Sequence, residues 1–285
     1  MWFKKLKLII VVCLIPLALA GCRNSAQRAD SQDTWTRIQK RGKVVIGLDD
    51  SFVPMGFREK NGNLTGYDVD LAKAVFRLYG IKADFQSIDW SMKETELRNG
   101  TIDALWNGYS ITKARQRKIA FSRPYLKNSQ VLVTKKQYKV ANFADMKGKS
   151  VGLQDGSTAQ SIFNDQPSLL KNRVKNRTAI LYDTFPKAFI DLNANRIQGI
   201  LMDKVYADYY IKHQKNSSSY RIISNPQVPT DYFGVGMRKG DVTLKKKINA
   251  GLERLKENGQ LEKINQKWFG NKSNYLGPVK NNQGI

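Results

Sequence analysis

Short apolar runs alternate with helical patterns along most of the chain, and this alternation limits the possible folds more than any other feature of the sequence. Lys43 to Leu48 is rich in β-branched residues, which predicts a buried strand. Further strands are expected at Lys82–Ser87, Ile102–Trp106, Ser150–Leu153, Ala179–Leu181, Gly199–Met202, Tyr220–Ile223 and Phe233–Met237. Because strands that alternate with helices form parallel-type sheets, we expect an α/β protein.

Helices are expected between these strands. Val69 to Tyr79 carries apolar residues at helical spacing, and Ser91 with Glu94 forms a capping box that opens a helix to Asn99. Further helices are expected at 158–163, 184–193, 204–212 and along an apolar stripe from 244 to 268. A second set of alternating elements begins near Lys149, which predicts two α/β units with crossovers near 135–136 and 225–226.

The N-terminus has the pattern of an export signal. Three lysines precede an apolar run from Leu8 to Leu19, which has signal-peptide length and is too short for an ideal membrane span. The run ends in Leu19-Ala20-Gly21-Cys22, similar to a bacterial lipoprotein cleavage box. We therefore predict a signal peptide at 1–21, lipid modification of Cys22 and a flexible tether at 22–36.

Composition excludes several kinds of site. With two cysteines and one histidine in the chain, a disulfide scaffold and a multi-histidine metal site are excluded, and no metal or cofactor is expected. His213 lies in a polar stretch and is expected at the surface. The net charge of +24 falls to +21 without the signal, and the absence of nucleic-acid-binding motifs favours solvated basic faces over a nucleic-acid partner.

Six motifs together resemble the polar amino-acid-binding proteins of ABC importers, solute-binding protein family 3. They are Asp49-Asp-Ser-Phe-Val-Pro-Met-Gly-Phe57, Gly66-Tyr-Asp-Val-Asp-Leu-Ala72, Asn99-Gly-Thr-Ile-Asp103, Gly108-Tyr-Ser-Ile-Thr-Lys-Ala-Arg115, Phe121-Ser-Arg-Pro-Tyr125 and Gly152-Leu-Gln-Asp-Gly-Ser-Thr158. The resemblance implies a type II periplasmic-binding-protein-like fold, in which two crossover hinge strands join two lobes. Lobe 1 is then expected at 37–131 plus 226–272, lobe 2 at 132–225, and a C-terminal tail at 273–285.

A free amino acid needs a partner for each of its charges, because an unpaired buried charge is costly. The resemblance places the carboxylate clamp at Ser110, Arg115 and Thr158, where a guanidinium and hydroxyls at helix starts favour an anion. It places the ligand's amino group at Asp203, which follows an apolar strand, with the carbonyl of Gly108 as a second acceptor. Asp203 as a helix N-cap is the alternative.

The ligand's side chain is expected to meet aromatic faces and one carboxylate. By the same resemblance, Phe52 and Trp90 flank it and Asp49 meets a cationic end. Tyr109 and Gln154 are further lining candidates. The alternatives are core packing for both aromatic residues, with a surface position also open to Trp90, a turn position for Asp49 and a solvated loop for Gln154.

We therefore expect a lipid-anchored extracytoplasmic receptor that binds an amino acid and delivers it to an ABC transporter permease, without catalysis. Asp49 and Asp203 disfavour acidic ligands, so that a basic or amide side chain is favoured and cystine stays open. The protein is expected to be a monomer whose membrane contact is the lipid on Cys22. The alternative is an extracytoplasmic prephenate or arogenate dehydratase, because the same fold hosts that enzyme.

Overall fold

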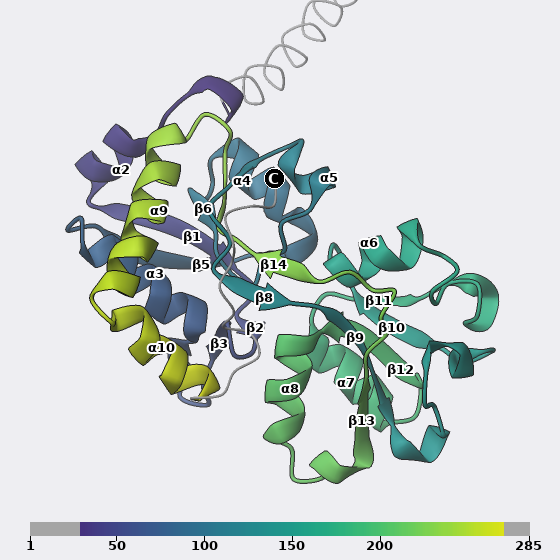
Figure 1. The fold of residues 1–285 in the computed structure, drawn as a ribbon. Helices are drawn as coiled ribbons and strands as arrows, with labels where there is room; N and C mark the ends of the chain where they lie inside the picture. Colours follow the sequence, from purple (N-terminus) through teal and green to yellow (C-terminus); the bar gives the residue numbers. More distant parts are fainter. Residues whose placement is uncertain (1–28, 271–285) are drawn as a thin grey trace, which may run out of the picture.

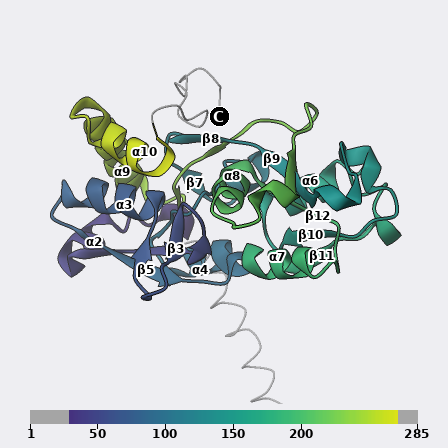
Figure 2. The same ribbon diagram turned by 90° about the horizontal axis from the view of Figure 1, so that it is seen from below.

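The computed structural model describes residues 29–270, which form two lobes side by side (Figures 1 and 2). Lobe 1 is built on a five-stranded sheet with the order β5-β1-β6-β15-β7. Its strands are β1 (Lys43–Leu48), β5 (Lys82–Ser87), β6 (Ala104–Leu105), β7 (Ala120–Phe121) and β15 (Gly236–Met237). The first three run parallel, and β15 is antiparallel to both of its neighbours. A small sheet lies between β1 and β5 in the sequence and consists of β2 (Ser51–Phe52), β3 (Gly56–Arg58) and β4 (Leu64–Thr65).

The helices of lobe 1 come from both ends of the described chain. They are α2 (Trp35–Arg41), α3 (Tyr67–Arg77), α4 (Lys93–Asn99), α5 (Lys113–Gln116), α9 (Val242–Glu257) and α10 (Gln260–Phe269). α3, α9 and α10 pack against one another at the outer end of the lobe. Gly251 permits this packing, since a β-carbon there would lie 2.7 Å from Cγ1 of Val75.

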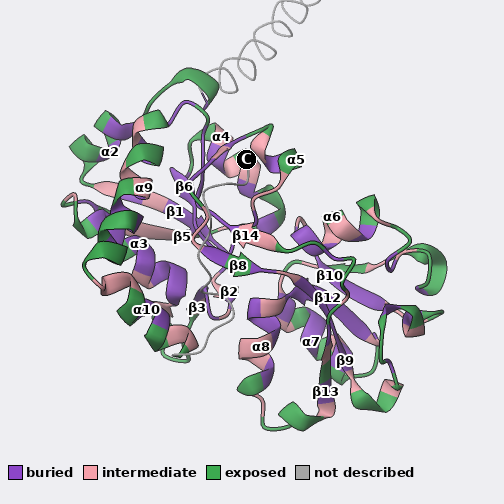
Figure 3. Cartoon of the chain, in the orientation of Figure 1, coloured by how far each residue is buried: buried purple, intermediate pink, exposed green. Residues whose placement is uncertain are grey.

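Lobe 2 has a second five-stranded sheet, with the order β11-β10-β12-β9-β13. Its strands are β9 (Gln130–Lys135), β10 (Val151–Gln154), β11 (Ile180–Tyr182), β12 (Gly199–Asp203) and β13 (Tyr220–Ile223). Its helices are α6 (Thr158–Asp165), α7 (Phe185–Asn193) and α8 (Lys204–Lys212). All residues of β10 and β12 are buried, in keeping with their continuous apolar sequences (Figure 3).

Two short antiparallel strands link the lobes. They are β8 (Leu126–Asn128) and β14 (Asp231–Phe233), which pair with each other and belong to neither five-stranded sheet (Figure 1). The crossovers expected near 135–136 and 225–226 are therefore misplaced, because residue 135 ends β9 and residues 225–226 follow β13, both strands of lobe 2. β9 starts at Gln130, just before the boundary expected after residue 131.

Most predicted strands and helices are confirmed, with two local corrections. Asp89, rather than the Ser91–Glu94 box, caps the turn before α4: its carboxylate accepts the Ser91 N–H at 2.9 Å. The single strand expected at Phe233–Met237 is two strands, since β14 pairs with β8 and β15 pairs with lobe 1. His213 is exposed, as predicted.

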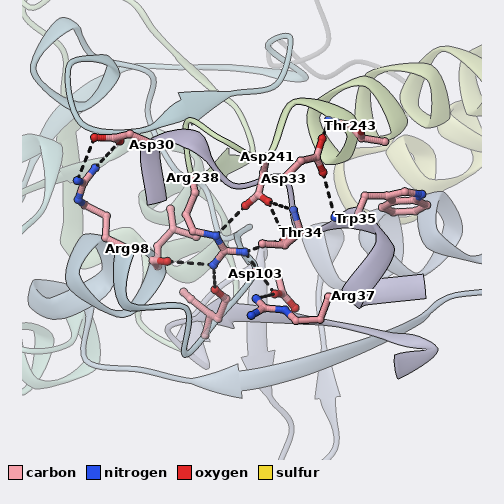
Figure 4. A network of polar contacts seen from close by, with 12 residues as sticks. Asp30, Asp33, Thr34, Trp35, Arg37, Arg98, Asp103, Arg238, Asp241 and Thr243 are labelled. Carbon is pink, nitrogen blue, oxygen red and sulfur yellow. Dashed lines mark hydrogen bonds and ion pairs between the residues drawn. The ribbon is translucent and has the colours of Figure 1, made fainter. Parts of the chain in front are cut away.

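The N-terminal end of the described chain is held against lobe 1 by a polar network around Arg238 (Figure 4). Arg238 forms ion pairs with Asp103 and Asp241, and Asp241 accepts the N–H of Thr34 at 2.9 Å. The Gly240 N–H also donates to the carbonyl of Ala29 at 3.0 Å. Residues 29–36 are thus docked on lobe 1, in contrast to the flexible tether expected at 22–36.

Residues 1–28 and 271–285 lie outside the described part, so the predicted signal peptide, the lipidation site Cys22 and the tail at 273–285 lie there too. Within residues 29–270, no helix is long and apolar enough to cross a membrane. The same residues contain no group of three or more His, Cys, Asp or Glu side chains arranged to hold a metal ion.

Candidate ligand-binding site

Arg115 lies where the two lobes meet. Its guanidinium is buried, with 7% of the residue exposed, and it donates to the carbonyl of Ser110 at 2.9 Å within lobe 1. It also reaches lobe 2, donating to the Thr158 hydroxyl at 3.1 Å and the Gly156 carbonyl at 3.2 Å. The sequence prediction therefore paired Arg115 with Thr158 correctly in space, although their role as a carboxylate clamp stays a prediction.

Short helices place both side chains. α5 begins after Thr112, whose hydroxyl accepts the Arg115 N–H at 3.2 Å, and Thr158 is the first residue of α6 after the N-cap Ser157. Thr158 thus stands at a helix start, as predicted. Ser110 does not, because it forms an isolated β-bridge with Phe233.

Aromatic and charged side chains of lobe 1 surround the guanidinium. Its carbon lies 4.4 Å from the centre of the Tyr109 ring, and its Nε lies 3.9 Å from the Glu94 carboxylate. Tyr109 donates its hydroxyl to the same carboxylate and packs edge-on against Trp90. Tyr109 is fully buried, and its ring packs against the guanidinium of Arg115.

Lys93 adds a second interlobe contact that the sequence analysis missed. The residue is 3% exposed, and its ammonium donates to the carbonyls of Trp90 in lobe 1 and Gly156 in lobe 2, at 2.9 and 2.8 Å. Burial and the nearby Arg115 guanidinium lower the pKa of Lys93 to about 7. The side chains of Lys93 and Arg115 therefore both donate to the carbonyl of Gly156, in the loop before α6.

Asp203 lies at the end of β12 and faces the strands that link the lobes. It occupies the N-cap position of α8 but makes no side-chain cap bond. Its Oδ1 instead accepts from the side-chain amides of Asn128 and Gln130, each at 2.7 Å. Burial and the neighbouring Asp231 carboxylate raise the pKa of Asp203.

Asp231 in β14 is a second carboxylate beside Asp203. Its Oδ2 accepts the Ser110 hydroxyl at 2.7 Å and the Gln130 amide at 3.4 Å. Burial raises its pKa, while Arg115 acts in the opposite direction. A continuous polar chain therefore runs from Arg115 through Ser110, Asp231 and Gln130 to Asp203.

Asp49 and Gln154 form a further contact between the lobes. The Gln154 amide donates to Oδ2 of Asp49 at 2.7 Å, while Oδ1 of Asp49 accepts both the N–H and the hydroxyl of Ser51. Both residues are buried, so Gln154 is no solvated loop residue. Burial raises the pKa of Asp49.

Phe52 and Trp90 lie in different aromatic groups among the described residues. Phe52 packs against Phe185 and Tyr206 of lobe 2, whereas the ring partner of Trp90 is Tyr109. Gly108 adjoins Phe52: its φ is +57°, and a β-carbon there would lie 2.8 Å from the Phe52 ring. The Gly108 N–H donates to Asp68 at 2.6 Å, whereas the role of its carbonyl as an acceptor for the ligand stays a prediction.

Sequence analysis missed Asn128, Gln130 and Asp231 as well as Lys93. Asn128 and Gln130 have a usable signal, because they stand two positions apart ahead of the apolar run Val131–Val133 and so share one face of an extended chain. Asp231 precedes the predicted strand at Phe233 without a distinguishing motif.

This arrangement can bind a molecule with opposite charges at two ends. Arg115 supplies a buried cation shared by both lobes, and Asp203 with Asp231 supplies acceptors for a cationic group. Backbone carbonyls hold the guanidinium of Arg115 in place, and two side-chain amides hold the carboxylate of Asp203.

Comparison with known proteins agrees with this geometry. The family model of the bacterial extracellular solute-binding proteins, family 3, matches residues 44–271. The chain belongs to this family. As one of the extracellular solute-binding proteins, it acts outside the cytoplasm, and the family is named for binding solutes.

Relatives of this solute-binding protein include the Escherichia coli (strain K12) ABC transporter arginine-binding protein 1, which is 30% identical over 80% of this chain and 90% of the relative. The L-cystine-binding protein TcyA of Bacillus subtilis (strain 168) is 29% identical over 93% of this chain and 96% of its own. A crystal structure of an ABC uptake transporter substrate-binding protein from Streptococcus pneumoniae with bound histidine has 47% identity and a TM-score of 0.83, covering 84% of this chain and 97% of that one. The two-lobe α/β fold is thus confirmed.

Proposed function

We propose that this solute-binding protein binds a polar amino acid between its lobes and delivers it to the permease of an ABC importer. The ligand carboxylate pairs with Arg115, Ser110 and Thr158, and its ammonium pairs with Asp203 and the Gly108 carbonyl. The observation that carries the proposal is the bond from buried Arg115 to Thr158, which joins the lobes at an anion-binding group. The relatives named for arginine, cystine and histidine support the ligand class.

We further propose that a basic or amide side chain is favoured, with cystine as the remaining candidate. Asp49 and Gln154 offer a carboxylate and an amide at the lobe boundary, while Phe52, Trp90 and Tyr109 supply aromatic faces. A cation over an aromatic ring gains about 0.5–2 kcal/mol. A glutamate or aspartate side chain would instead meet Asp49 with like charge.

The test is a thermal-shift screen of the purified protein with the twenty amino acids, ornithine and cystine, followed by calorimetry on each hit. Ligands that bind the folded state raise the unfolding temperature by mass action. We expect arginine, lysine, histidine, glutamine or cystine among the hits, and no response to glutamate or aspartate. A protein that binds none of these compounds but converts prephenate to phenylpyruvate would be the dehydratase instead.

We also propose that the protein is a monomer and that a lipid on Cys22 anchors it to the membrane. The sequence Leu19-Ala20-Gly21-Cys22 supports the anchor. Cys22→Ser should release the protein from the membrane fraction of cells. Fractionation in high salt is needed because the basic protein also adheres electrostatically, and salt screens that attraction but not acyl insertion. A variant that still pellets at high salt would contradict the anchor.

A further inference from the structure

The carboxylates of Asp203 and Asp231 share one amide donor although they come from different parts of the fold. Nε2 of Gln130 lies 2.7 Å from Oδ1 of Asp203 and 3.4 Å from Oδ2 of Asp231. Asp203 ends β12 in lobe 2, whereas Asp231 begins β14, one of the linking strands. Two buried carboxylates held this close repel each other unless a proton or a cation is shared between them.

Two acceptor atoms at this point have no hydrogen-bond partner among the described residues. They are Oδ1 of Asp231 and Oε1 of Gln130, and both atoms are buried. A buried polar group without a partner is costly, so such atoms indicate a missing donor. Gln130 itself is 1% exposed and its amide nitrogen is already committed to the two carboxylates.

Arg115 is the cation that acts on both carboxyl groups, but its guanidinium donates to Ser110, Thr158 and Gly156. Asn128, Gln130 and Ser110 are neutral donors. An ammonium group would supply three donors and the positive charge that the pair lacks.

We infer that Asp231 forms, together with Asp203, a two-carboxylate acceptor for the ammonium group of the ligand. This inference rests on the proposed function, and it assigns a ligand contact to the linking strand β14. Together with Asp49 at the lobe boundary, the protein then offers three buried carboxylates to the ligand. The excess of negative charge selects amino acids with a cationic side chain over neutral ones.

The test compares a ligand with its deamino analogue on wild-type protein and Asp231→Asn. The pairs are arginine with guanidinovalerate, histidine with imidazolepropionate, and cystine with dithiodipropionate, the pair being chosen by the tightest amino acid in calorimetry. Asparagine keeps one acceptor oxygen for the Ser110 hydroxyl, removes the charge and replaces the second oxygen with an amide NH2. We expect the variant to lose about tenfold or more in affinity for the amino acid and less than about threefold for the analogue.

Asp203→Asn is the matched comparison and should show the same pattern. An Asp231→Asn loss that is equal for the amino acid and its analogue would overturn the inference, because a merely structural effect does not distinguish them. Unchanged affinity for the amino acid would overturn it too. If Asp231→Asn does not fold, Asp231→Thr repeats the comparison with a residue that favours strands. Failure of wild type to bind any amino acid would instead overturn the proposed function.

Discussion

The side chain of Arg115 contacts both lobes. Its guanidinium is held by a carbonyl of lobe 1 and by a hydroxyl and a carbonyl of lobe 2. The ring of Tyr109 and the carboxylate of Glu94 limit its movement. A guanidinium fixed in this way meets a carboxylate with little further loss of side-chain entropy.

Arg115→Ala should abolish measurable binding at micromolar ligand. Removal of one member of a buried charge pair costs about 2–5 kcal/mol, roughly 30-fold to several-thousand-fold in affinity. Arg115→Lys should recover only part of this loss, because lysine lacks the planar fork. Calorimetry measures both, with exposed Arg117→Ala as the control two residues away. Less than a fivefold loss in a folded Arg115→Ala protein would show that Arg115 does not anchor the ligand.

Lys93 connects two elements, α4 of lobe 1 and the loop before α6 of lobe 2. Its pKa of about 7 is below the ordinary value for lysine, so the folded protein binds fewer protons than the unfolded chain between about pH 7 and pH 10. The contribution of Lys93 to the free energy of unfolding therefore rises with pH through that window. Arg115 and Lys118 lower the pKa of Lys93, while Glu94 and Asp155 raise it.

Wild type should accordingly gain roughly 2 kcal/mol of stability relative to Lys93→Met between about pH 7 and pH 9. Urea unfolding at several pH values measures the difference, and methionine keeps the length and apolar stem of the side chain. Exposed Lys113→Met serves as the control and should show the same pH profile as wild type. Parallel profiles for wild type and Lys93→Met would contradict the lowered pKa.

Gly66 precedes α3 in a backbone conformation that requires glycine. Its φ is +146°, and a β-carbon would lie 2.2 Å from the carbonyl oxygen of Met55. Gly66→Ala should therefore cost at least about 2 kcal/mol more than Gly62→Ala in urea unfolding, because backbone strain and overpacking add. Gly62 also has positive φ, but nothing lies within 4 Å of the added atom. Equal losses in the two variants would show that the contact with Met55 is relieved at no cost.

Elements with a strong pattern could be predicted from sequence, whereas the bounds of short ones could not. β1, β5 and β13 have the predicted bounds, since β1 is an apolar run, β5 alternates polar and apolar residues, and β13 is aromatic and β-branched. The two-residue strand β7 leaves no such pattern, and β15 is expected only as the end of a longer strand. The site follows the same rule: Asp203 ends a strand that the sequence defines and Arg115 ends a recognisable motif, whereas Ser110 meets Asp231 across 121 positions of sequence.

At the scale of the whole molecule, the groups proposed to bind the ligand divide between the lobes, Arg115 with Ser110 on lobe 1 and Thr158 with Asp203 on lobe 2. A ligand bound to one lobe alone would leave one of its charges unpaired. Differential contacts of this kind favour the closed state.

Saturating ligand should therefore reduce the radius of gyration measured by small-angle scattering. Arg115→Ala should show the reduction only at much higher ligand concentration. A wild-type radius that is the same with and without saturating ligand would contradict closure on binding.

The docking of Ala29 and Thr34 on lobe 1 makes the two lobes unequal in their relation to a membrane. With a lipid on Cys22, Ala29 would be seven residues away from it, a reach of at most roughly 25 Å for extended chain. Lobe 1 would thus stay close to the bilayer, and closure would move lobe 2 relative to it. A permease in the same membrane would then meet lobe 1 in a nearly constant position. It would distinguish the ligand-bound protein from the free protein by the position of lobe 2.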